Sequence, residues 1–122
     1  MTVREAIQKF DTLCDQCYER DLLIWWLAEL DYMAIQEVFS GYDGDPTPDP
    51  WLPSVYETDL STQLLIPAPY DGVYLEFLRM KCDDWNKEKN YTNSAKAFNN
   101  TYATFGDYWR RTHRKKQPCL RV

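Results

Sequence analysis

Two of the four cysteines are close enough to form a chemical site. Cys14 and Cys17 have Cys-x-x-Cys spacing, which occurs in thiol redox sites and in zinc sites. A redox pair belongs on a strand-to-helix turn, and zinc needs two further ligands at a recognisable spacing. Neither is present, because Cys82 and Cys119 are isolated and His113 is the only histidine. We expect all four cysteines to be ordinary packing or surface residues.

Two groups of carboxylates could indicate calcium binding or catalysis. Asp43, Gly44 and Asp45 resemble the start of a calcium loop, but the Glu expected at its twelfth position is missing and prolines break the required turn. Asp83 and Asp84 are adjacent on an expected helix, so their side chains point apart. The chain also lacks a glycine-rich phosphate loop and a nucleophile motif. The sequence therefore predicts no metal, no cofactor and no enzymatic activity.

The composition predicts one domain made mostly of helices. The chain has 122 residues, of which 44% are apolar and 16% aromatic, so it can bury a core. Only 4 glycines and 7 prolines indicate few turns and long regular elements. No apolar run could span a bilayer and no signal peptide follows Met1, so we expect a soluble protein made in a cytoplasm.

Charge is distributed unevenly along the chain. Residues 1–109 carry 8 basic and 19 acidic side chains, whereas the last 13 residues carry 6 basic side chains and no acid. An acidic body with a basic end favours docking of that end on an acidic partner or on nucleic acid, and a solvated terminus is the alternative. General DNA wrapping is disfavoured, because the acidic body would repel phosphates.

Apolar periodicity predicts helices at 3–13 and 19–39. Thr2 and Glu5 have the spacing of a capping box in front of the first helix. The second helix has two apolar stripes, so it needs two neighbours, either both in its own domain or one in an adjacent subunit. The first stripe contains Leu23, Trp26, Leu27, Leu30, Ala34 and Val38, and the second contains Trp25, Ala28, Tyr32, Ile35 and Phe39.

Residues 41–54 are too rich in glycine and proline for a helix and predict a long loop. Long loops on compact domains often serve a function, so we expect this one to bind a partner or a neighbouring subunit through Trp51. Residues 56–66 read as an irregular bridge with one turn near residues 58–60. Its apolar triplet, residues 64–66, is either a very short strand or a set of core plugs, that is, apolar side chains that fill the space between packed helices.

Two further helices should form an antiparallel hairpin. One begins after Pro67 and Pro69 and ends near Asn90, and the other starts at Tyr91. The second has apolar residues at steps of four and three, which is typical of a helix packed lengthwise on a neighbour. Its seam residues are Tyr91, Ala95, Phe98, Tyr102, Phe105 and Trp109. The sequence thus predicts an all-α bundle of about four helices at 1–112, followed by an extended basic tail at 113–122.

A series of short motifs runs in order along nearly the whole chain. The motifs are Trp26-Leu27-Ala28-Glu29-Leu30-Asp31, Ile66-Pro67-Ala68-Pro69-Tyr70-Asp71, Tyr74-Leu75, Asp84-Trp85-Asn86, Asn93-Ser94, Phe98-Asn99 and Arg111-Thr112-His113. Their order resembles small proteins encoded among the structural genes of tailed phages and prophages of Gram-positive bacteria. Those proteins are similar in turn to the head-tail adaptor, or connector, proteins of long-tailed phages.

The resemblance implies an all-helical, non-enzymatic subunit in the virion neck, made in the cytoplasm of the bacterial host. Such subunits assemble as a dodecameric ring on the portal protein and present a surface to a downstream neck or tail completion protein. Genome DNA passes through the ring without specific binding, and no membrane is involved. The alternative from the residues is a small helical regulatory or nucleic-acid-binding phage protein.

A ring uses heterologous contacts, which suit a helix with two apolar stripes. We therefore expect an inter-subunit interface formed by the residues Trp25, Tyr32, Ile35, Phe39 and Trp51. We expect the basic end to contact the portal through Arg110, Arg111, Arg114, Lys115 and Lys116.

Overall fold

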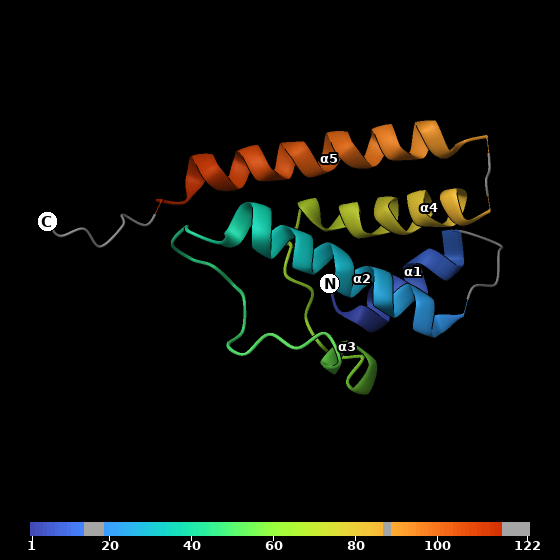
Figure 1. Cartoon of the computed structure of the whole chain (residues 1–122), viewed down its shortest axis with the longest axis horizontal. Coiled ribbons are helices and arrows are strands. Elements are labelled where there is room, and N and C mark those ends of the chain that lie inside the picture. Colours follow the sequence, from blue (N-terminus) through green and yellow to red (C-terminus); the bar gives the residue numbers. More distant parts are fainter. Residues whose placement is uncertain (14–18, 87–88, 116–122) are drawn as a thin grey trace, which may run out of the picture.

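The computed structural model describes residues 1–13, 19–86 and 89–115, and these residues form an all-α fold without a β-strand (Figure 1). Cys14, Cys17, Cys119 and the interruption between the predicted helices 3–13 and 19–39 lie outside the described residues. The α-helices are α1 (Val3–Leu13), α2 (Arg20–Ala34), α3 (Val55–Thr58), α4 (Val73–Trp85) and α5 (Tyr91–Thr112). A π-helical turn, Ile35–Phe39, continues α2, and a 3-10 turn, Tyr70–Gly72, leads into α4.

The capping box at the start of α1 is confirmed. The Thr2 amide donates to Glu5 Oε1 at 3.0 Å, and the Glu5 amide donates to Thr2 Oγ1 at 3.1 Å. The bridge segment holds the same end of the helix, because the Val3 amide donates to the Thr62 carbonyl at 3.0 Å. The triplet at 64–66 is buried and is not a strand, so its three residues are core plugs between the helices.

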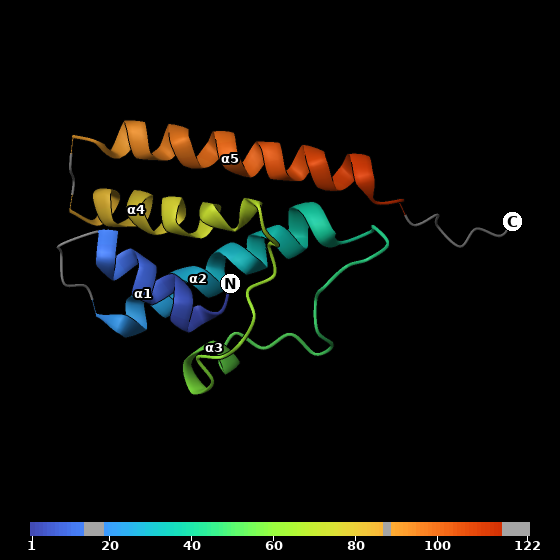
Figure 2. The same cartoon turned by 180° about the vertical axis from the view of Figure 1, so that it is seen from behind.

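Helix α4 occupies the middle of the fold. It packs along α5 on one side and against α1 and α2 on the other, while α3 packs on α2 (Figures 1 and 2). The predicted hairpin of α4 and α5 is confirmed, and Phe77 meets Phe98 across it with ring centroids 5.0 Å apart. Helix α4 ends at Trp85, earlier than the predicted end near Asn90, and Trp85 is 67% exposed.

The seam predicted for α5 is buried over most of its length. Phe98, Phe105 and Trp109 are in the core, and only Tyr91, at the first turn, is exposed, to 40%. Helix α5 has no layer on its outer side, which is why its other face carries Asn, Thr and charged residues. Packing on one side through an aromatic row makes this seam the main attachment of α5.

The two apolar stripes of α2 differ in how completely they are buried. The first stripe is buried throughout, whereas the second divides: Trp25 and Tyr32 are exposed, and Phe39 is completely buried. The π-helical turn explains the division, because its wider turn, closed by the Ser40 amide on the Ile35 carbonyl, rotates Phe39 out of phase with Tyr32. Phe39 then packs on the α5 seam, 4.7 Å from the Trp109 ring.

The described part of the predicted basic tail packs on the domain. The His113 ring stacks on Trp109 with centroids 3.6 Å apart. The Asp43 amide donates to the Arg114 carbonyl at 2.8 Å, and Lys115 pairs with Tyr42 in an isolated bridge. The boundary predicted at residue 113 therefore falls inside a contact between the end of the chain and the start of the loop.

We predict that Phe105→Ala lowers the free energy of unfolding by about 3–5 kcal/mol, because it opens a cavity under the α5 seam. Tyr91→Ala is the matched control from the same seam, and we expect it to cost less than about 1 kcal/mol since the side chain is exposed at the first turn of α5 and lies outside the core. Urea titrations followed by circular dichroism measure both values. Equal effects of the two substitutions would contradict the packing described for α5.

Candidate functional site

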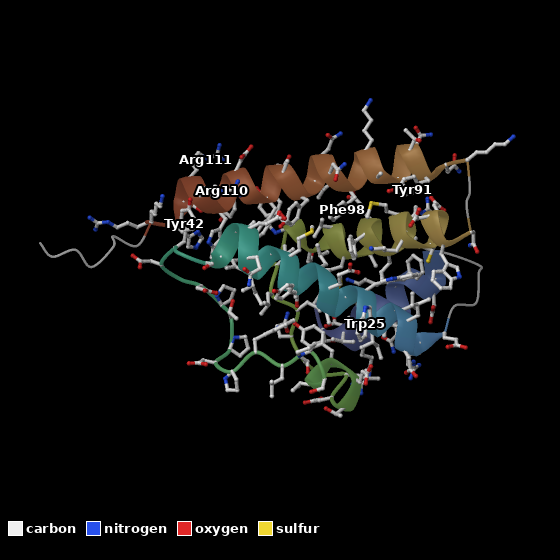
Figure 3. The ribbon with its side chains drawn as sticks, in the orientation of Figure 1. Trp25, Tyr42, Tyr91, Phe98, Arg110 and Arg111 are labelled. Carbon is white, nitrogen blue, oxygen red and sulfur yellow. The ribbon has the colours of Figure 1, made fainter. Side chains whose placement is uncertain are left out.

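An open groove lies between α2 and residues 51–57. Its volume is about 570 Å³, and its walls are mainly apolar and aromatic. Figure 3 shows Trp25 on the α2 ribbon, well away from the end of the molecule where Tyr42, Arg110 and Arg111 gather. We call this space the aromatic groove; it is lined by Ile24, Trp25, Ala28, Glu29, Tyr32, Trp51, Pro53, Ser54 and Glu57.

Three aromatic side chains dominate the groove. Trp25 is 67% exposed and Tyr32 is 52% exposed, so each presents one ring face to water. Trp51, which is half-buried, stacks on Tyr32 with ring centroids 5.8 Å apart. Exposed aromatic rings of this kind are enriched at protein interfaces, where burying them contributes much of the binding energy.

The second wall of the groove is held in place by a buried carboxylate. Asp31 is completely buried in α2, and its Oδ2 accepts a hydrogen bond from the Tyr56 hydroxyl of α3 at 2.5 Å. The Tyr56 hydroxyl in turn accepts from Trp51 Nε1 at 3.0 Å. Asp31 therefore helps to fix the position of Trp51 through the hydroxyl that both side chains bind.

The same carboxylate fixes the core plugs. Its Oδ1 accepts from the Tyr74 hydroxyl of α4 at 2.5 Å, and its Oδ2 also accepts from the Leu65 amide at 3.3 Å. The Ile66 amide donates to the Tyr74 hydroxyl at 2.7 Å. We call this set of contacts the Asp31 network, and it joins α2, α3, α4 and the bridge segment.

Burial raises the pKa of Asp31 to about 6, because the charged form loses its hydration. The hydrogen bonds from Tyr56, Tyr74 and Leu65 oppose this shift, since they stabilise the carboxylate. Burial and the neighbouring Asp31 charge raise the pKa values of Tyr56 and Tyr74. Both tyrosines therefore keep their hydroxyl protons for Asp31.

The structure brings three of the predicted interface residues together and separates two. Trp25, Tyr32 and Trp51 all line the aromatic groove. Ile35 is half-buried against the core and does not line the groove, and Phe39 is inside the core. The prediction that Phe39 lies at an inter-subunit interface is therefore corrected: the π-helical turn directs it to α5.

The predicted portal residues are in different environments. Arg110 Nη2 donates to the Glu37 carbonyl at 3.1 Å, and Nη1 lies 3.7 Å from Asp107 Oδ1, so Arg110 ties α5 to the π-helical turn. Arg111 is exposed on the last turn of α5. Arg114 and Lys115 are held through their backbones, with side chains that are exposed. Lys116 lies outside the described residues.

Sequence periodicity did not identify the buried carboxylate. Asp31 lies four residues after Leu27 and three before Ala34, which places it within the apolar stripe of α2. The available signal in the sequence was the carboxylate on an apolar stripe, because a buried carboxylate needs hydrogen-bond donors from other elements. Tyr56 and Tyr74 could not be chosen from the nine tyrosines without knowing the fold.

The groove lies in a part of the chain without cations. Between residues 21 and 78 there are acidic residues but no Lys, Arg or His. The acids are Asp21, Glu29, Asp31, Glu37, Asp43, Asp45, Asp49, Glu57, Asp59, Asp71 and Glu76. Glu29 and Glu57 border the groove directly, and Glu29 also pairs with Lys81 at 3.4 Å.

Within residues 1–13, 19–86 and 89–115, no group of three or more His, Cys, Asp and Glu side chains is arranged to hold a metal ion. The helices of the same residues include none with the length and hydropathy of a membrane span. Asp45, from the sequence that resembles a calcium loop, accepts hydrogen bonds from the amide and hydroxyl of Thr47.

No family model, no curated protein and no solved structure matches the chain.

We predict that Asp31 makes stability fall as pH rises from acid to neutral. The folded state holds a proton on Asp31 up to about pH 6, whereas an unfolded chain releases it near pH 4, so the contribution is fully present below pH 4 and lost as pH rises through about 6. Between about pH 4.5 and 7.5 the loss is roughly 2 kcal/mol.

Asp31→Asn removes this titration. The difference in unfolding free energy between wild type and Asp31→Asn should therefore shift by that amount over the same pH range, in favour of the variant at high pH. Trp85→Ala, which changes an exposed side chain without a titratable group, is the control and should give a flat difference. Urea titrations at several pH values measure these differences. A flat curve for Asp31→Asn would contradict the raised pKa.

Proposed function

We propose that this chain is a head-tail adaptor subunit of a long-tailed phage or prophage. It assembles as a dodecameric ring on the portal protein in the virion neck, extends the DNA channel and presents a surface to the downstream neck or tail completion protein. The observation that carries the proposal is the aromatic groove, an open and mainly apolar surface bordered by exposed aromatic side chains.

The position of the groove supports a heterologous contact. Ring assembly joins one face of a subunit to a different face of the next subunit. The groove lies on α2 and residues 51–57, whereas the exposed cations Arg111 and Lys115 lie at the far end of the molecule, where α5 ends (Figure 3). These two surfaces differ in shape and charge, so the groove can meet a neighbouring subunit while the cationic end stays free for another partner.

The charge distribution supports passage of DNA without binding. Eleven acids and no cation between residues 21 and 78 make this part of the molecule repel phosphates. The exposed side chains of Arg111, Arg114 and Lys115 are then available for an acidic surface of the portal. Arg110 serves a different purpose, because Glu37 and Asp107 already engage it.

We predict that Trp25→Ala weakens ring assembly on purified portal protein by at least about tenfold, since truncating an interface tryptophan costs about 2 kcal/mol. Trp85→Ala is a close control, because Trp85 is also 67% exposed but lies outside the groove. Size-exclusion chromatography with light scattering measures the assembly, and electron microscopy counts the subunits. No association of the wild-type chain with portal would overturn the proposal.

The exposed cations at the end of α5 support one alternative, a small helical regulator that binds nucleic acid. That function predicts DNA affinity that falls steeply with salt and is lost when Arg111, Arg114 and Lys115 are changed to Gln. The adaptor function predicts little affinity for free DNA. Fluorescence anisotropy with a labelled duplex at two salt concentrations distinguishes the two functions.

A further inference from the structure

The aromatic groove has the chemistry to bind an extended basic peptide that contains proline. Its rings come from Trp25, Tyr32 and Trp51, and grooves lined by aromatic rings accept proline and aliphatic side chains of extended peptides. Its acids, Glu29 and Glu57, border these rings. A cation placed between an aromatic face and a carboxylate gains from both.

One segment of this chain has the matching sequence. Residues 116–122 read Lys-Gln-Pro-Cys-Leu-Arg-Val, with cations at Lys116 and Arg121 and apolar side chains at Pro118 and Leu120. The segment contains no acid. Its charge is opposite to that of the acids that border the groove, and its apolar residues lie between the two cations.

The described end of the chain lies away from the groove. Residues 113–115 lie at one extreme of the long axis of the molecule (Figures 1 and 2), where Lys115 pairs with Tyr42. Arg110 holds the last turns of α5 to the Glu37 carbonyl, and Glu37 is two turns of helix beyond the groove residue Glu29. Seven residues span at most about 24 Å when extended, which is enough to enter an adjacent molecule.

We propose that the aromatic groove binds the C-terminal segment 116–122 of a second copy of this chain. Pro118 and Leu120 lie against Trp25, Tyr32 and Trp51, and Lys116 and Arg121 meet Glu57 and Glu29. This inference rests on the proposed ring, and it names the contact that joins one subunit to the next. The portal is then contacted by Arg111, Arg114 and Lys115.

The test is a titration of the full-length protein with a peptide of residues 114–122 carrying Cys119→Ser, followed by tryptophan fluorescence and calorimetry. We expect saturable binding that weakens at least tenfold in Trp25→Ala and in the double variant E29K/E57K. Trp85→Ala and Asp11→Lys, which change an exposed tryptophan and an exposed acid outside the groove, should leave the affinity unchanged.

A charge exchange makes the test specific. A peptide carrying K116E and R121E should bind wild type weakly and should recover affinity for E29K/E57K. Absence of saturable binding, or binding that Trp25→Ala does not change, overturns the inference. Tighter peptide binding by the full-length K116E/R121E variant than by wild type, by a factor that does not change with protein concentration, also overturns it, because the segment would then occupy the groove of its own chain.

The inference and the proposed function can fail separately. Portal rings that form normally with the K116E/R121E variant, together with no peptide binding, overturn the inference alone. Saturable, charge-dependent peptide binding without any association with portal supports the groove contact and overturns the adaptor function.

Discussion

The buried carboxylate of Asp31 is the interaction on which most of the architecture depends. A charge in a protein interior is tolerated only when several donors replace its hydration, and here donors arrive from α3, α4 and the bridge segment. The bridge segment is irregular and α3 is a single turn of helix, so apolar packing alone would leave their positions poorly specified. One acceptor group therefore sets the relative placement of four parts of the chain.

This arrangement also links the core to the surface. Tyr56 donates inward to Asp31 and accepts outward from Trp51, so a single hydroxyl lies between the core and the aromatic groove. Residues 51–57 contain one turn of helix and would otherwise have little to hold them against α2. The hydrogen bonds that satisfy the buried Asp31 carboxylate therefore also hold residues 51–57 against α2. No further element is needed to shape the groove.

The helices were predictable because their apolar patterns follow the helical repeat over many residues. The capping box, the hairpin of α4 and α5 and the buried stripe of α2 follow from local chemistry and periodicity. Phe39 was wrongly predicted at the interface because a π-helical turn changes the phase of the helix, and nothing in the sequence of residues 35–39 indicates that turn. Of the groove, Trp25, Tyr32 and Trp51 could be named from sequence, whereas the partners of Asp31 come from segments far apart in the chain and required the fold.

The pairing of Tyr42 and Asp43 with Arg114 and Lys115 joins the beginning of the loop to the end of the described chain. The same loop continues through its prolines to Trp51, which forms one wall of the groove. One continuous stretch of backbone therefore runs from the contact with the end of α5 to the wall of the groove. A change in how residues 114 and 115 are held alters the anchor of the same loop that supplies Trp51.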